Sequence, residues 1–437
     1  MAYDIIIGRD EADKKIFGDK GTILIGKTYV KMGQFTSLSN NLYLDVARNH
    51  VILVCGKRNS GKSYYLSAVA EGIANLEREI AKNISVLMFD TMGIFWSMKY
   101  PNQAEEDLLK EFNLRPEGIE VNVYTPKGKF QNMKDKGIPV DYSFTIKTNE
   151  LSAEDWLSVF SLDILNPVGI LIERIIGNLE EKDYEINDIL NEIKKDEKSE
   201  KNTKDAAENR FLTAKSWGIF EKEGTKIKDM LKGGKISILD LSSYDDWNVR
   251  SLVVSLLCKK LFRERMVVRK FEELKDIESG QHYFDFEEKK LEIPLVWLLI
   301  DEAQEFLPKD KKTPATDALL QLLREGRQPG ISLVLATQQP GQIHTDAITQ
   351  ADIVVSFRIT AKFDIDALKE IMQTYLDYDI LGYLNNLPKI KGSGIILDDN
   401  SERIYSMRIR PKISWHGGSA PSSVRVRRRE LLDLKLD

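Results

Sequence analysis

The chain has 437 residues, of which 42% are hydrophobic and 30% are charged, and its formal net charge at neutral pH is −5. This length predicts two or three domains, and the composition excludes a disordered protein. The acidic balance argues against a protein that coats nucleic acid with its whole surface, but it is compatible with a local basic channel.

The first residues lack the positive flank and the long apolar core of a secretion signal. No apolar run approaches the ~20 residues that a membrane-spanning helix requires. The two cysteines, Cys55 and Cys258, have no partners at metal-ligand spacing. We therefore expect a cytoplasmic protein without membrane insertion, disulfides or a bound transition metal.

The N-terminal part, residues 1–46, is predicted to be a small β module. Short alternating runs occur at Asp4–Ile7, Gly21–Ile25 and Leu42–Asp45, and turn-forming glycines separate them. This pattern is typical of short strands joined by tight connections.

From residue 50 onward the pattern changes to short, nearly continuous apolar runs. These are His50–Cys55, Ser85–Asp90, Lys235–Leu241, Pro294–Asp301, Ile331–Thr337 and Asp352–Phe357. Such runs are typical of strands buried on both faces, and the segments between them are long enough for crossover helices. The sequence therefore predicts an α/β fold with a mainly parallel, doubly wound sheet that binds its ligand at the carboxyl ends of the strands.

Two segments are expected to lie outside this core, which would comprise residues 47–147 and 233–410. Residues 148–232 are predicted to form a helical insertion. Its apolar residues Ile164, Leu165, Val168, Leu171, Ile172 and Ile175 fit one face of a helix. Residues 411–437 are predicted to be a basic tail, because Arg403 to Arg429 includes seven Arg and one Lys but no acidic residue. This stretch could bind a phosphate backbone, dock on an acidic neighbour or be solvated.

Residues 56–63, Gly-Lys-Arg-Asn-Ser-Gly-Lys-Ser, match the pattern G-x-x-x-x-G-K-[ST] of a phosphate-binding loop (P-loop). An apolar run precedes this loop and an amphipathic helix is expected after it, so bound phosphates would lie at the positive end of the helix. Lys62 is expected to reach the β- and γ-phosphates of ATP, and Ser63 to ligate Mg²⁺. The residues expected to contact the nucleotide are Gly56, Asn59, Ser60, Gly61, Lys62, Ser63 and Tyr64.

Acidic and polar residues follow other predicted strands. Asp301 ends the apolar run Leu295–Ile300 and is a candidate Mg²⁺ ligand, and Glu302 can polarise the attacking water. Gln338, after the fifth run, could sense the γ-phosphate, or it could belong to a polar turn. Asp90 and Asp240 end two further strands, where each could contact the nucleotide or only cap the strand end.

Arg324 and Arg327 lie just before the fifth predicted strand. An arginine supplied across a subunit boundary can neutralise charge in the transition state of phosphoryl transfer. Exposed arginines are common, so the sequence pattern alone leaves a plain surface role open.

Taken together, these residues resemble the HerA/FtsK group of ATPases and, within it, the HerA type. The likeness is carried by residues 48–50 (Arg-Asn-His), 89–93 (Phe-Asp-Thr-Met-Gly), 300–303 (Ile-Asp-Glu-Ala), 324–327 (Arg-Glu-Gly-Arg), 336–340 (Ala-Thr-Gln-Gln-Pro) and 415–418 (Trp-His-Gly-Gly). The short β-rich start resembles the N-terminal barrel of that family. Arg58 and Asn59 depart from it, because they stand where the family's loop usually carries Thr-Gly.

The resemblance implies a RecA-like core and a homohexameric ring that translocates on double-stranded DNA, with a NurA-like nuclease, in processing DNA ends. It also implies Glu302 as catalytic base, Gln338 as sensor, Arg327 as the arginine supplied to the neighbouring subunit and Arg48 as an arginine near the nucleotide. Two other interpretations stay open: a related motor for DNA transfer or for defence against foreign DNA, and a nucleotide switch without sustained hydrolysis. Glu302 argues against the switch.

Overall fold

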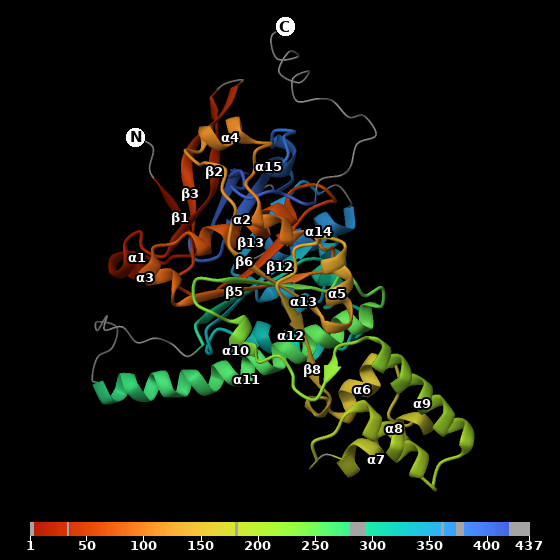
Figure 1. Cartoon of the computed structure of the whole chain (residues 1–437). Coiled ribbons are helices and arrows are strands. Elements are labelled where there is room, and N and C mark those ends of the chain that lie inside the picture. The colour runs from red at the N-terminus through yellow and green to blue at the C-terminus, as the bar shows by residue number, and fades with distance from the viewer. Residues whose placement is uncertain are drawn as a thin grey trace.

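The computed structural model describes residues 4–32, 35–179, 182–279, 293–359, 362–372 and 380–418 (Figure 1). Its central feature is one sheet of 13 strands with the order β1-β3-β2-β15-β14-β13-β4-β12-β11-β5-β10-β6-β7. The part from β13 to β7 is parallel throughout. Its strands are β4 (Val51–Cys55), β5 (Ile84–Asp90), β6 (Val121–Pro126), β7 (Tyr142–Phe144), β10 (Ile236–Asp240), β11 (Leu295–Ile300), β12 (Ile331–Thr337) and β13 (Ile353–Phe357).

The predicted α/β class with a mainly parallel sheet is confirmed, and the ends of each apolar run named above agree with those of one of these strands to within one residue. Alternate residues of one strand face different hydrophobic clusters, as the pleat of a strand requires. In β11, Leu298 and Ile300 belong to the cluster that includes α11 (Trp247–Ser279), while Trp297 and Leu299 belong to the cluster that includes α2 (Lys62–Ala74). Burial on both faces explains why β11 is apolar at every position.

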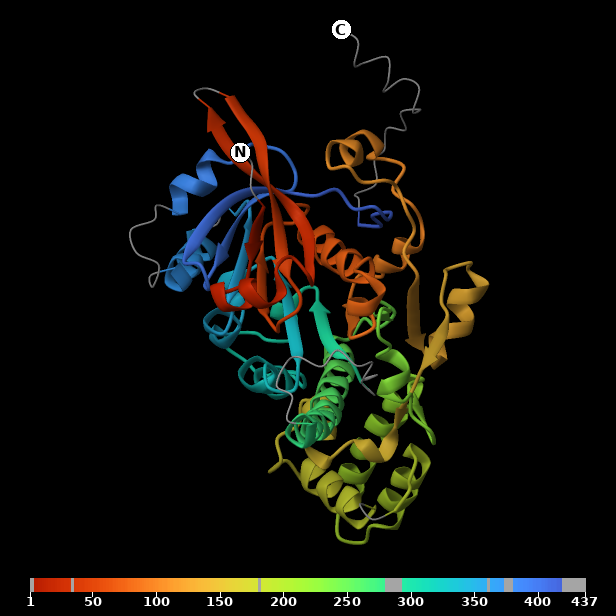
Figure 2. The same ribbon diagram turned by 90° about the vertical axis from the view of Figure 1, so that its left-hand side faces the viewer.

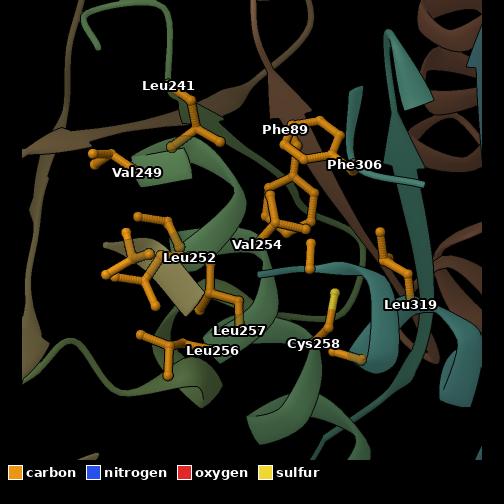
Figure 3. Packing of buried hydrophobic residues seen from close by; sticks show 14 of the residues in the cluster. Phe89, Leu241, Val249, Leu252, Val254, Leu256, Leu257, Cys258, Phe306 and Leu319 are labelled. Atoms are coloured by element: carbon orange, nitrogen blue, oxygen red, sulfur yellow. The ribbon is translucent and has the colours of Figure 1, made fainter. Parts of the chain in front are cut away.

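Helices cover both faces of the sheet. The remaining helices of the core are α1 (Glu11–Phe17), α3 (Arg78–Ala81), α4 (Glu106–Glu111), α5 (Lys127–Asp135), α12 (Thr316–Glu325), α13 (Thr345–Thr349), α14 (Lys362–Met372) and α15 (Ile380–Asn386). Figure 3 shows Leu252, Leu257 and Cys258 of α11 gathered with Phe89 of β5 and with Phe306. The far end of α11 projects beyond the body in Figure 1. No helix among the described residues has both the length and the apolar character needed to cross a membrane.

The expected helical insertion consists of α6 (Ala153–Val159), α7 (Pro167–Leu179), α8 (Ile186–Lys195), α9 (Lys201–Ser216) and α10 (Ile227–Met230). Helices α6 to α9 lie at one end of the molecule in both views (Figures 1 and 2). They are joined to the core by the short pair β8 (Ile146–Lys147) and β9 (Phe220–Glu221). Ile164 and Leu165 were expected on the buried face of a helix, but they precede α7 and are exposed. The helix begins only at Pro167, a residue well suited to a first helical turn.

The N-terminal strands are continuous with the central sheet. The strands β1 (Ile5–Ile7), β2 (Thr22–Met32) and β3 (Phe35–Asp45) do form, but β2 pairs with β15 (Arg403–Ile409), so they extend the central sheet. Gly26 permits this junction, because a Cβ there would lie 2.3 Å from the carbonyl oxygen of Arg408. The sequence pattern missed β15 and its antiparallel neighbour β14 (Ser393–Asp398), which connect the two parts.

The structure describes the predicted basic tail as far as residue 418. Residues 411–418 pack against the core, and residues 419–437 lie outside the described part of the chain. The anchor is the carboxylate of Glu71 in α2, which is fully buried. It accepts hydrogen bonds from Arg410 Nη1 (3.0 Å), from the N–H groups of Ile413 (3.1 Å) and Ser414 (3.0 Å), and from Ser414 Oγ (2.5 Å). The first residues of this segment are therefore anchored by a buried acidic side chain of the same chain.

Replacing Glu71 with alanine tests this anchor. The change leaves the Arg410 guanidinium buried without its carboxylate, and we expect a loss of about 3–5 kcal/mol in the free energy of unfolding, measured by urea titration. The matched control is Glu79→Ala, which removes an exposed carboxylate paired with Lys82 and should leave the free energy of unfolding nearly unchanged. Similar losses for the two variants would contradict the anchoring role.

Candidate nucleotide site

The P-loop connects β4 to α2, as the sequence predicts. Asn59 and Gly61 have φ angles of 63° and 123°, in the left-handed region that most side chains avoid. Gly61 adopts it without a Cβ, and asparagine is among the few other residues that tolerate it. The tight curl of the loop is thus kept although Asn59 stands where related loops carry glycine.

Ser63 and Asp301 meet at the carboxyl edge of the sheet. Ser63 Oγ donates a hydrogen bond of 2.5 Å to Asp301 Oδ2. Burial raises the pKa of Asp301 above its usual value, although the hydrogen bond from Ser63 opposes this shift. A hydroxyl and a carboxylate are the hard oxygen donors that suit Mg²⁺, so this pair fits a magnesium site.

Lys62 lies at the same carboxyl edge of the sheet. Its Nζ donates a hydrogen bond of 3.0 Å to the carbonyl of Lys57 within the loop. Burial lowers the pKa of Lys62, while the nearby charges of Glu302 and Asp301 act in the opposite direction. A buried ammonium with so few partners is a strong binding group for an anion.

Glu302 has an unusual backbone. Its φ is 54°, which for a residue with a side chain costs about 1–3 kcal/mol, and such strain is typical of functional sites. Its carboxylate accepts hydrogen bonds from Gln304 Nε2 (2.8 Å) and from Gln338 Nε2. Because β11 and β12 are parallel neighbours, Glu302 and Gln338 emerge side by side from the same edge. The structure therefore brings Lys62, Ser63, Asp301, Glu302 and Gln338 together.

Arg48 and Arg327 lie at the opposite edge of the sheet. Both precede their strands, and a five-residue strand such as β4 spans roughly 15–20 Å. Arg48 forms hydrogen bonds of 2.7 and 2.8 Å with Asp13 and lies over the ring of Phe17. The structure thus does not bring Arg48 to the P-loop of its own chain, because it lies at the wrong end of β4.

The carboxylate of Asp90 is hydrogen-bonded to the backbone of the turn that follows it. Its carboxylate accepts hydrogen bonds from the N–H groups of Met92 (3.2 Å), Gly93 (2.7 Å) and Phe95 (2.8 Å). Asp240 lies directly across from it on β10. Burial, followed by the charge of Asp240, raises the pKa of Asp90 to about 7. Of the two roles left open for Asp90, the structure shows the cap: its carboxylate organises residues 91–95.

This pair predicts a pH dependence of stability. Because the native pKa of Asp90 is about 7 and the usual value is 3.8, the native state holds a proton that the unfolded state has released between these values. The free energy of unfolding should therefore fall as the pH rises from 3.8 to about 7, and it should level off above 7. Asp240→Asn removes the neighbouring charge and brings the native pKa of Asp90 closer to 3.8. The free energy of unfolding should then depend less on pH, which urea titrations between about pH 4 and pH 8 can measure.

The exposed Asp245 supplies the control for that measurement. Asp245→Asn changes the net charge equally but should keep the slope of the original protein. If Asp240→Asn keeps this slope as well, the two carboxylates do not interact as described.

Tyr64 directs its side chain away from the loop. Its hydroxyl donates to Glu105 Oε2 (2.7 Å) and accepts from the N–H of Lys412 (2.6 Å), and its ring contacts His416. Burial raises the pKa of its phenol. The side chain of Tyr64 therefore holds the C-terminal segment, and only its backbone, in the first turn of α2, lies beside the P-loop.

A cavity of about 290 Å³ adjoins the P-loop on the side of β13. Its basic lining residues are Lys57, Arg58, Arg358, Lys389 and Lys391, and among the described residues no acidic side chain lines it. The last three of these residues were not predicted from the sequence. Arg358 had a signal, since it directly follows an apolar strand, whereas Lys389 and Lys391 reach the loop only through the fold.

Comparison with known proteins gives a consistent assignment. The family model described as the helicase HerA, central domain, matches residues 30–261, more than half of the chain. A DNA double-strand break repair helicase HerA of Pyrococcus furiosus is 26% identical over 192 residues, which are 41% of this chain and 34% of that protein. A probable helicase of Methanocaldococcus jannaschii is 25% identical over 360 residues, 79% of this chain and 59% of that protein. The chain thus spans less than two thirds of the length of these relatives.

Solved structures share the fold. VirB4 of Thermoanaerobacter pseudethanolicus superposes with a TM-score of 0.52 at 12% identity, covering 90% of this chain and 97% of that chain. The bacterial conjugative coupling protein TrwB, in a form lacking its N-terminal part, gives a TM-score of 0.50 at 12% identity and covers 87% and 88%. The RecA-like P-loop ATPase core predicted from the sequence is therefore confirmed, and the chain belongs to the family defined by the central domain of the helicase HerA.

Proposed function

We propose that this chain is an ATP-dependent motor that translocates on double-stranded DNA as a homohexameric ring. The observation that carries the proposal is the meeting of Lys62, the Ser63–Asp301 pair and the Glu302–Gln338 pair at one sheet edge. Helicases among the relatives support DNA as the substrate. From the same family resemblance, we also propose a role in DNA end processing together with a NurA-like nuclease.

Hydrolysis needs each of these groups. Lys62 neutralises the β- and γ-phosphates, while Ser63 and Asp301 would hold Mg²⁺, which supplies further positive charge to the phosphates. Glu302 accepts a hydrogen bond from the attacking water and polarises it, and Gln338 fixes the orientation of that carboxylate. A switch protein that does not hydrolyse has no use for a strained Glu302 held in this way.

The direction of the nucleotide follows from the strand order. Catalytic side chains lie on the β12 and β11 side of the P-loop strand, and the basic cavity lies on the β13 side. With its terminal phosphate near Glu302, ATP would extend its nucleoside into this cavity. Apolar lining residues such as Ile359 and Leu387 provide surfaces for a flat base.

The proposal is tested by measuring ATP hydrolysis with and without duplex DNA. DNA should raise the rate, and Glu302→Gln should keep nucleotide binding but lower kcat by about 10²–10⁴-fold, because the water loses its base. The control Glu305→Gln changes an exposed carboxylate three residues away and should hydrolyse normally. An unaltered rate in Glu302→Gln, or no response to DNA, would overturn the proposal.

Arg327 is proposed to complete the site of the neighbouring subunit. Two exposed or partly exposed arginines near the amino edge of the sheet are engaged: Arg48 with Asp13, and Arg324 with Asp346 at 2.6 Å. Arg327 is exposed, and its guanidinium has no ion pair within the described ranges. Its backbone is held, since Asn49 Nδ2 donates to the Arg327 carbonyl at 2.9 Å. An available cation on a fixed loop, too distant from its own P-loop, suits a role in trans.

Mixing two inactive variants tests this role. Arg327→Ala subunits keep a sound P-loop but lack the arginine, and Lys62→Ala subunits have the opposite defect. Each alone should lose roughly 10³-fold in ATPase activity, and mixtures should regain part of it, because some intact loops then face intact arginines. Mass measurements confirm subunit exchange, and no recovery after confirmed exchange would exclude the trans role.

A further inference from the structure

Arg265 in α11 has a completely buried guanidinium. Its Nε donates to the carbonyl of Pro329 at 2.6 Å, and its Nη1 donates to the carbonyl of Ile293 at 2.6 Å and to Glu272 Oε1 at 3.1 Å. Its Nη2 has no hydrogen-bond partner in the described part of the chain. Hydrophobic residues of similar volume often replace such buried charges without loss of stability, so packing alone does not account for an arginine here.

The two carbonyls belong to functional segments. Pro329 lies two residues after Arg327, in the turn that leads into β12. Ile293 lies just before β11, the strand that ends at Asp301 and Glu302. One guanidinium thus ties α11 to the loop that carries Arg327 and to the start of the strand that carries the catalytic base.

The turn is shaped to receive this side chain. Gly330 has a φ of 84°, and a Cβ there would lie 2.4 Å from Leu295 Cδ2 and 3.0 Å from Arg265 Nη2. On its other side, the same turn is held by the hydrogen bond from Asn49 to Arg327. The loop is therefore fixed from two directions, by a partly exposed amide and by a buried cation.

We propose that Arg265 is a positioning residue that holds residues 326–330 so that Arg327 reaches the nucleotide of the neighbouring subunit. This inference rests on the trans role proposed above for Arg327. A displacement of about 1 Å in a catalytic group can cost about 10²-fold in rate. Loss of the two carbonyl contacts should therefore impair the arginine given to the neighbour more than the pocket of the same chain.

The primary variant is Arg265→Met, which keeps the length of the side chain but removes every donor. We expect normal binding of a non-hydrolysable ATP analogue, an unchanged KM and a kcat lowered by about 10²-fold. Arg269→Met is the matched control on the same helix, because Arg269 is partly exposed and its ion pairs within the described ranges are with Glu272 and Glu273. It should retain the original kcat.

Crossed mixtures separate positioning from general damage. Arg265→Met subunits mixed with Lys62→Ala subunits should regain activity, since the Lys62→Ala subunits supply a well-placed Arg327. Arg265→Met mixed with Arg327→Ala should regain none, because both lack a working arginine. If Arg265 merely supports β11 and the pocket of its own chain, the two results are reversed, and the proposal is overturned.

The mixture of Arg327→Ala with Lys62→Ala is the reference. Without recovery there, the trans role itself fails, and the positioning role fails with it. With recovery there but none for Arg265→Met with Lys62→Ala, only the positioning role fails. If Arg265→Met does not assemble, Arg265→Lys replaces it in the same mixtures. Its single ammonium can keep one of the two carbonyl contacts, so a smaller loss of kcat is expected.

Discussion

The structure depends on one constraint, the parallel pairing of β4, β12, β11 and β5. In parallel neighbours the carboxyl ends of all strands meet at one edge, so residues that follow different strands become neighbours whatever their distance in the chain. Thr337 pairs with Cys55, and Ile300 pairs with Phe89. Because of this register, Ser63 and Asp301, which are 238 positions apart, come within hydrogen-bonding distance.

The same pairing separates two sets of charged groups. The carboxyl edge holds Lys62 beside Glu302, and the basic cavity continues this edge past β13. The amino edge holds Arg48, Arg327 and Arg265, which all precede strands or pack on their beginnings. This separation suits the proposed ring: with nucleotide bound at one edge and Arg327 offered at the other, a repeated head-to-tail arrangement of identical subunits would complete every site.

The segment after β15 connects the N-terminal strands, the P-loop helix and the C-terminus. Glu71 lies in α2, about two turns beyond Ser63, and binds Arg410 and Ser414. Tyr64, the residue after Ser63, binds the backbone of Lys412. Burial lowers the pKa of Lys412 to about 8, although the charge of Glu71 opposes the shift. The P-loop helix is therefore packed against a C-terminal segment whose composition alone resembled a solvated tail.

Local patterns in the sequence determined the strand–loop–helix unit, the runs of buried strands and the acidic pair Asp301–Glu302. These features are readable because each depends on neighbouring residues: burial on both faces requires an unbroken apolar run, and a phosphate cradle requires glycines at set spacing. The alternating strand β6 and the strands β14 and β15 lacked that signal, and Ile164 and Leu165 followed the helical period but precede the helix. Only the tertiary structure decided that Arg48 and Tyr64 are engaged elsewhere, that Arg327 stays available and that the buried Arg265 touches its loop. Such roles arise from contacts between residues far apart in the chain, and a side chain's partners across a fold leave no mark on its own local sequence.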